Sequence, residues 1–356
     1  MTMADEEAPP GGDEATPPPI TELPPRLPPR WASGGRTFSK FDGMSLAARV
    51  ARLCAVVILL VGAVVVATVT IAGLGPPSEE DLRREAGLLD KRQLLIGVKD
   101  DQPGMSLREN GVYRGFDVEI AYLVAADLGF APDDVRFLTI ESEDRARRQA
   151  LDVKSNKIVT VDLVVATFSI TKARIDDPDV MFSAPYLRTE QSVLTRKTTN
   201  RYEALSDLAG EKVCTLNTTT SAQNLRAAGV QPVGKNKISE CVKGLESGAY
   251  EAVSTDAAIL AGFVHVNPGK FTIHDIGAEG SELYGINVGR NKALQTLVNL
   301  SLYRSYTEPT DRRWETAYDD CLRVEQPDAM PQQVAVAQQP EVDRPRVRIW
   351  PWETEP

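Results

Sequence analysis

Two hydrophobic patterns alternate along the middle of the chain. Short apolar runs of the kind found in buried strands occupy residues 94–98 and 161–168, and further strands are expected over 212–216 and 251–255. Apolar residues recur at helical spacing after Asp117 and again over 241–245. Strands separated by helices predict parallel α/β layers, and the roughly 235 residues from 90 to 324 are enough for two lobes.

A long apolar segment precedes this region. Residues 53–74 carry no charged side chain, and at about 1.5 Å per residue they span about 33 Å, enough to cross a hydrocarbon core. Arg49 and Arg52 precede the segment and Glu79 and Glu80 follow it, so the cationic flank is expected in the cytoplasm. A buried core helix or a cleaved signal peptide would also be apolar. The length of the segment disfavours both, as does its start about fifty residues into the chain.

We therefore expect a single-pass anchor in the cell membrane and an extracellular C-terminal domain. Prolines are dense before residue 30 and again after residue 326, among charged residues and glutamine or glycine. Such segments bury too little apolar surface to offset the entropy lost on ordering. We expect residues 1–48 to form a disordered cytoplasmic tail and residues 325–356 a disordered C-terminal tail.

Composition narrows the function. The 356 residues contain 40 Lys and Arg against 50 Asp and Glu, a net charge of −10, which argues against nucleic acid as the partner. The sequence has two histidines, and its four cysteines show no zinc-binding spacing. A histidine-based triad or a metal hydrolase is therefore disfavoured, and we expect no metal and no cofactor.

Six short strings follow one another in a specific order. They are Ile96-Gly97-Val98-Lys99, Asp101-Gln102-Pro103-Gly104, Gly115-Phe116-Asp117-Val118, Ser169-Ile170-Thr171 with Arg174, Phe182-Ser183-Ala184-Pro185-Tyr186, and Ser254-Thr255-Asp256-Ala257. With this order and spacing, residues 90–324 resemble the family 3 extracellular solute-binding proteins, which are the polar amino-acid receptors of ABC importers. The sequence is most similar to the glutamate/aspartate-binding members of actinobacteria.

The resemblance implies an α/β fold of the two-lobed, periplasmic-binding-protein-like type II, with a hinge and here a preceding transmembrane helix. Lobe 1 would comprise residues 90–190 and 285–324, and lobe 2 residues 191–284. The chain would cross between the lobes near 191–193 and near 284–286. A ligand that bridges both lobes would favour the closed state.

The same resemblance assigns residues that grip a free amino acid. Arg174 would bind the α-carboxylate through its planar guanidinium, with Thr167 and Ser169 contributing carbonyl, hydroxyl or N–H contacts from the preceding loop. Asp256 would pair with the ammonium group. A surface arginine and a helix N-cap remain the alternatives for Arg174 and Asp256.

Two threonines at an expected helix start complete this part of the site. Thr219 and Thr220 would offer hydroxyl and free N–H groups to an anion. Thr218 stands where the family commonly has glycine, which leaves the shape of the turn open.

Selectivity for the ligand side chain is assigned to cations. Lys99, at the end of the first strand, and Arg148, in an expected helix before Leu151, fall where acidic amino-acid receptors bind the distal carboxylate. A second buried carboxylate without cations would be costly. Arg145 and Arg147 lie close by in the sequence, and solvated helix charges are the alternative.

The family also suggests a role for two cysteines. Cys214 and Cys241 occupy the positions of a cysteine pair in the actinobacterial receptors. Outside the membrane this favours a disulfide, with two buried thiols as the alternative. Cys321 stays unpaired in this interpretation, and Cys54 lies in the membrane.

Three functions follow. The favoured one is an anchored receptor that delivers glutamate or aspartate, with glutamine or asparagine as further candidates, to an ABC permease by hinge closure. The second is a ligand sensor that signals across the membrane. The third, a cyclohexadienyl-dehydratase-like enzyme, is disfavoured because an ammonium-binding Asp256 and an intact Arg174 site are retained.

Overall fold

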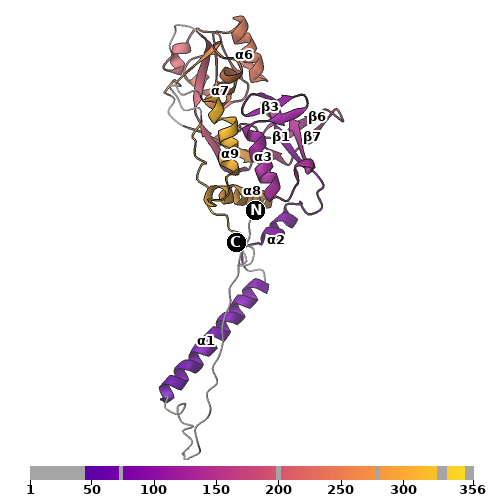
Figure 1. Ribbon diagram of the computed structural model, residues 1–356, viewed down its shortest axis with the longest axis vertical. Coiled ribbons are helices and arrows are strands. Elements are labelled where there is room, and N and C mark those ends of the chain that lie inside the picture. The colour runs from indigo at the N-terminus through magenta and orange to yellow at the C-terminus, as the bar shows by residue number, and fades with distance from the viewer. Residues whose placement is uncertain (1–44, 72–74, 198–201, 278–280, 327–334, 349–356) are drawn as a thin grey trace, which may run out of the picture. The chain divides into compact units, whose positions relative to one another are not determined.

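The computed structural model describes residues 45–71, 75–197, 202–277, 281–326 and 335–348 (Figure 1). The chain divides into two units, Met1–Thr68 and Val69–Pro356. Most of the expected N-terminal tail, residues 1–44, lies outside the described residues. The same holds for 327–334 and 349–356 of the expected C-terminal tail.

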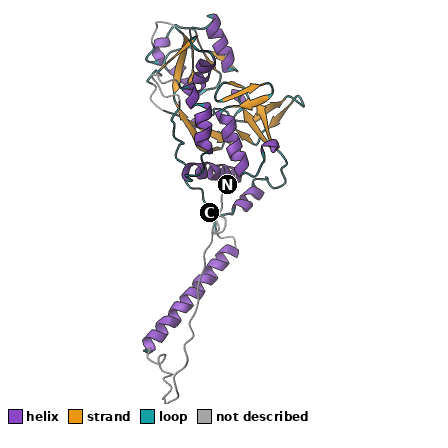
Figure 2. Cartoon of the chain, viewed as in Figure 1, coloured by secondary structure: helices purple, strands orange, loops and turns teal. Residues whose placement is uncertain are grey.

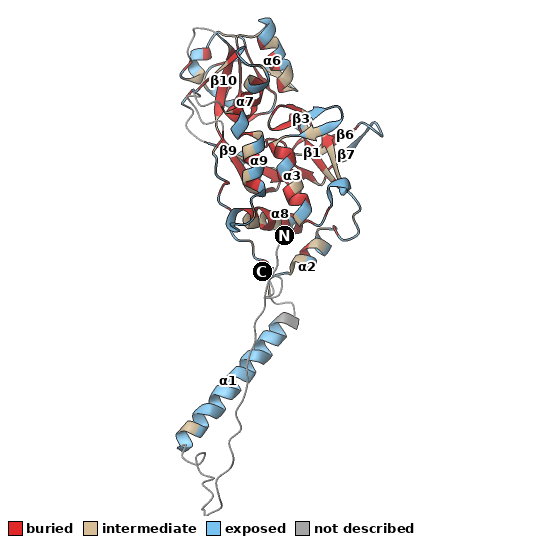
Figure 3. Ribbon diagram, viewed as in Figure 1, coloured by how far each residue is buried: buried red, intermediate tan, exposed pale blue. Residues whose placement is uncertain are grey.

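Helix α1 (Leu46–Ile71) carries the apolar segment. It begins seven residues before the expected span, and the last expected residues, 72–74, lie outside the described chain. Residues Leu46–Val69 are long and apolar enough to cross a membrane, and none of their most apolar stretch is buried against the described chain. A helix in a soluble core would bury such side chains, whereas the large apolar side chains of Leu46–Val69 are exposed (Figure 3).

Lobe 1, formed by the described residues from 75 to 189 and from 281 onward, contains a seven-stranded sheet in the order β7-β6-β5-β1-β8-β15-β9. The strands are β1 (Leu94–Val98), β5 (Val135–Thr139), β6 (Gln149–Asp152), β7 (Lys157–Thr160), β8 (Leu163–Val164), β9 (Phe182–Thr189) and β15 (Glu282–Asn287). The helices are α2 (Glu79–Glu85), α3 (Phe116–Asp127), α4 (Lys172–Ile175), α8 (Lys292–Thr307) and α9 (Arg313–Cys321). Strands β2 (Asp101–Gln102), β3 (Ser106–Glu109) and β4 (Val112–Arg114) form a separate small sheet.

Lobe 2, the described residues between Glu190 and 277, contains a five-stranded sheet in the order β12-β11-β13-β10-β14. The strands are β10 (Gln191–Arg196), β11 (Val213–Leu216), β12 (Val233–Lys235), β13 (Ala252–Asp256) and β14 (Phe271–His274). The helices are α5 (Thr220–Ala227), α6 (Ile238–Ser247) and α7 (Ala257–Val266), and Figure 2 shows strands and helices in both lobes. Short 3₁₀ turns lie at Pro132–Asp134, Ser142–Asp144, Leu205–Leu208 and Arg323–Glu325.

The chain passes twice between the lobes. The first crossing is at Glu190, between β9 and β10. The second lies between β14 and β15, because Glu282 already pairs with Thr189 of β9. Tyr284 therefore belongs to lobe 1, and the second crossing precedes the expected position at 284–286. A strand that pairs along its whole length with lobe 1 leaves no hinge at that position.

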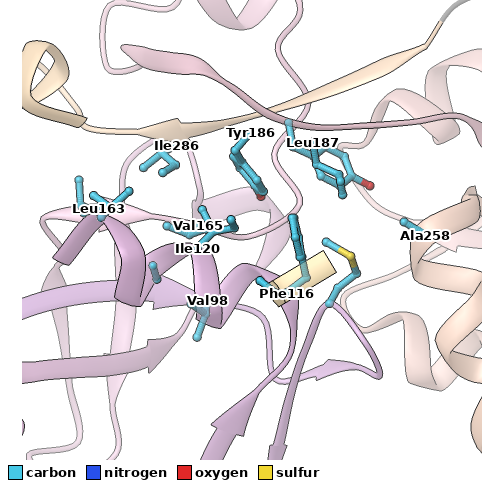
Figure 4. Close-up of a cluster of buried hydrophobic side chains, with 14 of the residues drawn as sticks. Val98, Phe116, Ile120, Leu163, Val165, Tyr186, Leu187, Ala258 and Ile286 are labelled. Atoms are coloured by element: carbon cyan, nitrogen blue, oxygen red, sulfur yellow. The ribbon is translucent and has the colours of Figure 1, made fainter. Parts of the chain in front are cut away.

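The main core includes the lobe 1 sheet and continues into lobe 2. Figure 4 shows Phe116 and Ile120 of α3 among strand side chains such as Val98 and Tyr186. Trp314 of α9 is fully buried and donates its indole N–H to the carbonyl oxygen of Tyr186 at 2.8 Å. Burial on this scale holds lobe 1 as one rigid body on which the site is built.

Residues 335–348 are ordered, which corrects the expectation of a disordered tail over 325–356. Ala335, Val342 and Val347 are buried in the main core, and Gln339 donates to the carbonyl oxygen of Leu302 at 3.0 Å. Widely spaced apolar residues and paired main-chain groups hold the segment, and neither feature is visible in its composition.

The disulfide between Cys214 and Cys241 is present, with a Cα–Cα distance of 5.4 Å. It joins β11 to α6 within lobe 2. Both cysteines are fully buried.

Candidate functional site

A cavity lies where the ends of both sheets face each other. Its volume is about 10 Å³, room for about one water molecule. The lining residues come from both lobes: Arg145, Thr167, Ser169, Arg174, Leu216, Thr219, Thr220, Ser221, Thr255, Asp256 and Ile259. Six of the eight residues expected to bind ligand are therefore brought together, namely Thr167, Ser169, Arg174, Thr219, Thr220 and Asp256.

Arg174 is positioned by its own short helix. Thr171 caps α4 and accepts the main-chain N–H of Arg174 at 3.3 Å. The guanidinium donates to the carbonyl oxygen of Ser169 at 2.7 Å and, across the lobes, to that of Thr218 at 3.3 Å. It also lies 4.6 Å from the ring centre of Phe168. Arg174 is thus a cavity residue rather than a surface arginine.

Asp256 ends β13 on the opposite lobe. It occupies the N-cap position of α7, but its side chain makes no capping hydrogen bond. Instead Tyr284 donates its hydroxyl to one carboxylate oxygen, and Ser221 donates to the other at 3.4 Å. Burial, and then the charge of Glu282, raise the pKa of Asp256 to about 7, against the opposing effects of Tyr284 and the two cavity arginines.

The loop after β8 holds Thr167 in a conformation that favours glycine. Its φ is 46°, which is costly for a β-branched residue. Asp117 accepts the Thr167 N–H at 2.9 Å, and Arg145 donates to the Thr167 carbonyl oxygen at 2.8 Å. The main-chain N–H and carbonyl groups of Thr167 are thereby both fixed next to the cavity.

The threonine turn begins α5. Thr219 caps the helix by accepting the N–H of Ala222 at 3.2 Å, and its hydroxyl donates to the carbonyl oxygen of Leu216 at 2.9 Å. Thr218 has a φ of 56°, the region in which glycine is favoured. The turn therefore forms although Thr218 replaces the expected glycine.

Arg145 is the one charged lining residue that the sequence analysis did not assign. It is 3% exposed and donates to the carbonyl oxygens of Ser142 and Ala166 at 3.1 and 3.0 Å. It lies 4.7 Å from the Phe168 ring centre, so both cavity arginines contact one aromatic ring. Burial, and then the charge of Arg174, lower the pKa of Arg145 to about 9.

The two cations assigned to selectivity do not line the cavity. Lys99 is fully buried, donates to the carbonyl oxygen of Ile140 at 3.2 Å and lies 3.5 Å from Glu141. These contacts hold Lys99 next to the end of β5. Its charge is paired there with that of Glu141, outside the cavity.

Arg148 is turned away from the cavity as well. It does not lie in a helix: its φ is 57°, and strand β6 begins at the next residue. Its guanidinium donates to the carbonyl oxygen of Val161 at 2.8 Å and packs so closely on Gly289 that a Cβ there would overlap it.

Further contacts close the lobes on each other. Lys237, at the N-terminus of α6, donates to both carboxylate oxygens of Asp100 at 2.8 and 2.7 Å. Asp101 accepts the main-chain N–H of Ser239 at 3.0 Å. Gly262 of α7 faces the carbonyl oxygen of Pro103, which a Cβ at position 262 would overlap. The structure is therefore a closed form of the two lobes.

A bilobed α/β domain with a polar interlobe cavity defines the class of solute-binding proteins. Residues 94–323 match the model of the bacterial extracellular solute-binding proteins, family 3, and the chain belongs to this family.

Among its relatives is the glutamate-binding protein GluB of Corynebacterium efficiens, 32% identical over 71% of this chain and 87% of the relative. The ABC transporter glutamine-binding protein GlnH of Bacillus subtilis is 29% identical over 67% of this chain and 84% of its own. A solved structure titled an ancestral arginine-binding protein bound to glutamine is 28% identical, with a TM-score of 0.56, and covers 65% of this chain and 97% of its own.

Proposed function

We propose that the protein is an extracellular, membrane-anchored receptor for acidic amino acids that delivers its ligand to an ABC permease by hinge closure. The observation that carries the choice of ligand is the charge of the cavity. Among its lining residues two are cationic, Arg145 and Arg174, and one is acidic, Asp256. An ionised cavity therefore carries one net positive charge.

Only a ligand with one net negative charge balances this cavity. Glutamate and aspartate carry two carboxylates and one ammonium group, so the sum of cavity and ligand is zero. Glutamine or asparagine would leave one positive charge uncompensated, and arginine would leave two. Because an unpaired charge costs several kcal/mol in a buried site, about as much as separates a strong ligand from a weak one, the acidic amino acids are favoured.

The two lobes would hold opposite ends of the ligand. Arg174 and the N-terminus of α5 at Thr219 and Thr220 would bind the α-carboxylate, and Asp256 would bind the ammonium group. The carbonyl groups of the Thr167–Ser169 loop would contribute further contacts to the ligand. Arg145 would then face the distal carboxylate, the role that the sequence assigned to Lys99 and Arg148.

Ligand entry requires the lobes to move apart. The closed cavity has room for about one water molecule, whereas an amino acid is several times larger. The contacts of Arg174 with Thr218 and of Asp256 with Tyr284 link residues of opposite lobes. A ligand that replaces them with its own charged groups would favour closure around itself.

The anchor is proposed from α1. A solute receptor tethered outside the membrane would stay near its permease. Fractionation of cells expressing the full chain should recover it with membranes and leave residues 75–348 accessible to protease added outside. Recovery of a shortened, soluble protein that lacks α1 would show instead that the helix is a signal sequence.

Calorimetric titration of the full chain with L-glutamate, L-aspartate, L-glutamine and L-asparagine tests the ligand class. We expect the two acidic amino acids to bind at least ten-fold more tightly than their amides. Arg145→Gln should abolish this preference, whereas Arg147→Gln, a change of an exposed arginine two residues away, should preserve it. Equal or tighter binding of glutamine by the unmodified chain would contradict the proposal.

A further inference from the structure

Hydrogen bonds connect the candidate ligand residue Asp256 to the hinge. Ala257, the next residue, donates its main-chain N–H to the carbonyl oxygen of Glu190 at 2.7 Å. Ala258 donates its N–H to the hydroxyl oxygen of Thr189 at 3.3 Å. The N-terminus of α7, which carries Asp256, is thus fixed to the two residues of the first crossing between the lobes.

The ordered C-terminal segment, residues 335–348, starts at the same two-residue crossing, and we call it the strap. Ala335 forms an antiparallel bridge with Thr189, and Val336 donates its N–H to the carbonyl oxygen of Arg188 at 2.9 Å. Thr189 therefore contacts lobe 2 through its side chain and the strap through its main chain. A rotation of lobe 2 at this crossing acts directly on the start of the strap.

The strap then follows lobe 1 to the other end of the domain. Tyr318 donates its hydroxyl to the carbonyl oxygen of Ala335 at 2.8 Å, and Val342 and Val347 are buried in the main core. At its end Arg348 donates its N–H to the carbonyl oxygen of Pro77 at 2.9 Å and forms a parallel bridge with Ser78. Its guanidinium lies 3.4 Å from Asp81 of α2.

Ser78 begins the first structured element after the apolar helix. It caps α2 through a reciprocal pair of hydrogen bonds with Asp81, and it follows the end of α1, Ile71, by seven residues. Both the strap and α2 lie outside residues 94–323, the part of the chain that matches the solute-binding family. They join the hinge of the binding domain to residues 77–81, which follow α1 in the chain.

We propose that the strap couples closure of the lobes to residues 77–81, which follow α1 in the chain. The domain would then report ligand occupancy toward the membrane as well as binding the ligand. Coupling of this kind is reciprocal: a change that stabilises the closed hinge also stabilises the contacts of Arg348 with residues 77–81, and stabilising those contacts favours closure. The proposal depends on the proposed function only for the identity of the ligand.

The first test uses no ligand. Thr189→Val in the full chain removes the acceptor for the Ala258 N–H, while Thr189→Ser retains it. Hydrogen exchange is followed at Arg348 and in α2, with the amides of β1 as the reference for global stability. We expect exchange at the distant sites to be about five-fold faster in the valine variant and unchanged in the serine variant, since one net hydrogen bond is lost. Equal exchange in both variants would overturn the coupling.

The second test adds L-glutamate to the same samples, with binding verified by calorimetry. Exchange at Arg348 and in α2 should slow in the unmodified chain and in Thr189→Ser, and should respond several-fold less in Thr189→Val. Verified binding without any change at these amides would also refute the coupling. If L-glutamate and the three other amino acids fail to bind, the proposed function is wrong, and the comparison of the two Thr189 variants still decides the role of the strap.

Discussion

The ion pair between Asp100 and Lys237 allows the energetics of closure to be measured outside the cavity. It joins the end of β1 in lobe 1 to the start of α6 in lobe 2 through two short hydrogen bonds. Burial lowers the pKa of Lys237, but the hydrogen bond and charge of Asp100 outweigh it, so the pKa is raised overall. Neither residue lines the cavity, and a change at Lys237 therefore leaves the ligand contacts intact.

The magnitude follows from the exposure of the pair. The side chains are 34% and 16% exposed, so the bond is weaker than a buried charged pair and stronger than a fully exposed one. We assign it about 1 kcal/mol, between the values for exposed ion pairs and for hydrogen bonds to charged groups. If the ligand binds tightly only to the closed form, loss of this energy raises the Kd about five-fold.

The assay compares Lys237→Ala with Lys243→Ala, a change of an exposed lysine on the same helix. Calorimetry with L-glutamate should show a Kd about five-fold higher for Lys237→Ala and unchanged for Lys243→Ala. High salt should reduce the difference, because it screens a partly exposed pair. An unchanged Kd for Lys237→Ala would refute the view that this pair stabilises the closed state relative to the open one.

Three further outcomes are expected. The pKa of Asp256 is raised to about 7, and its protonated form cannot pair with an ammonium group. The Kd should therefore rise as the pH falls below 7, approaching a ten-fold increase for each pH unit, and a flat profile from pH 5 to 8 would exclude Asp256 from ammonium binding. Thr218→Gly should raise the free energy of unfolding by up to about 1 kcal/mol, because it relieves a left-handed conformation. Thr219→Ala should lower that free energy by about 1 kcal/mol, because it removes the cap, and a urea denaturation that shows either change with the reversed sign would contradict the assignment of the turn. Reduction of the Cys214–Cys241 disulfide, which spans a sequence separation of 27, should lower that free energy by about 3.5 kcal/mol in the chain-entropy model, and identical unfolding with and without reductant would contradict it.

The sequence predicted those site residues whose position depends on local structure. Arg174 follows a threonine that caps a one-turn helix, and Asp256 ends a strand that is buried along its whole length. In both places the resemblance to the solute-binding family singled out the residue, and the regular local structure keeps it at the position that the resemblance implies. The cysteine pair was suggested by the same resemblance, whereas the apolar helix was predictable from its length and lack of charge alone.

The second arginine that lines the cavity, Arg145, was not predictable in this way. The stretch from 142 to 152 contains three arginines, and its pattern suggested a helix around Arg148. The structure has a 3₁₀ turn, then a left-handed residue at Arg148 and strand β6. Which of the three arginines faces the cavity depends on that irregular backbone and on the carbonyl groups of the Thr167 loop, which only the tertiary structure brings near.

The strap was missed for a different reason. Composition counts prolines and charges over a whole segment, whereas burial of 335–348 depends on a few apolar positions such as Val342 and Val347 and on partners supplied by distant strands. A segment can be poor in apolar residues and still be ordered when its main-chain groups find partners.

Gly262 determines how closely the two lobes can approach each other. A glycine inside α7 costs the helix about 1 kcal/mol relative to alanine, and the space gained is taken by the main chain of Pro103 from the other lobe. Any side chain at position 262 would hold the two lobes apart and leave the cavity between them open to solvent. The absence of a side chain at this one position thus determines the end point of closure, and with it the smallest volume in which a bound molecule can be enclosed.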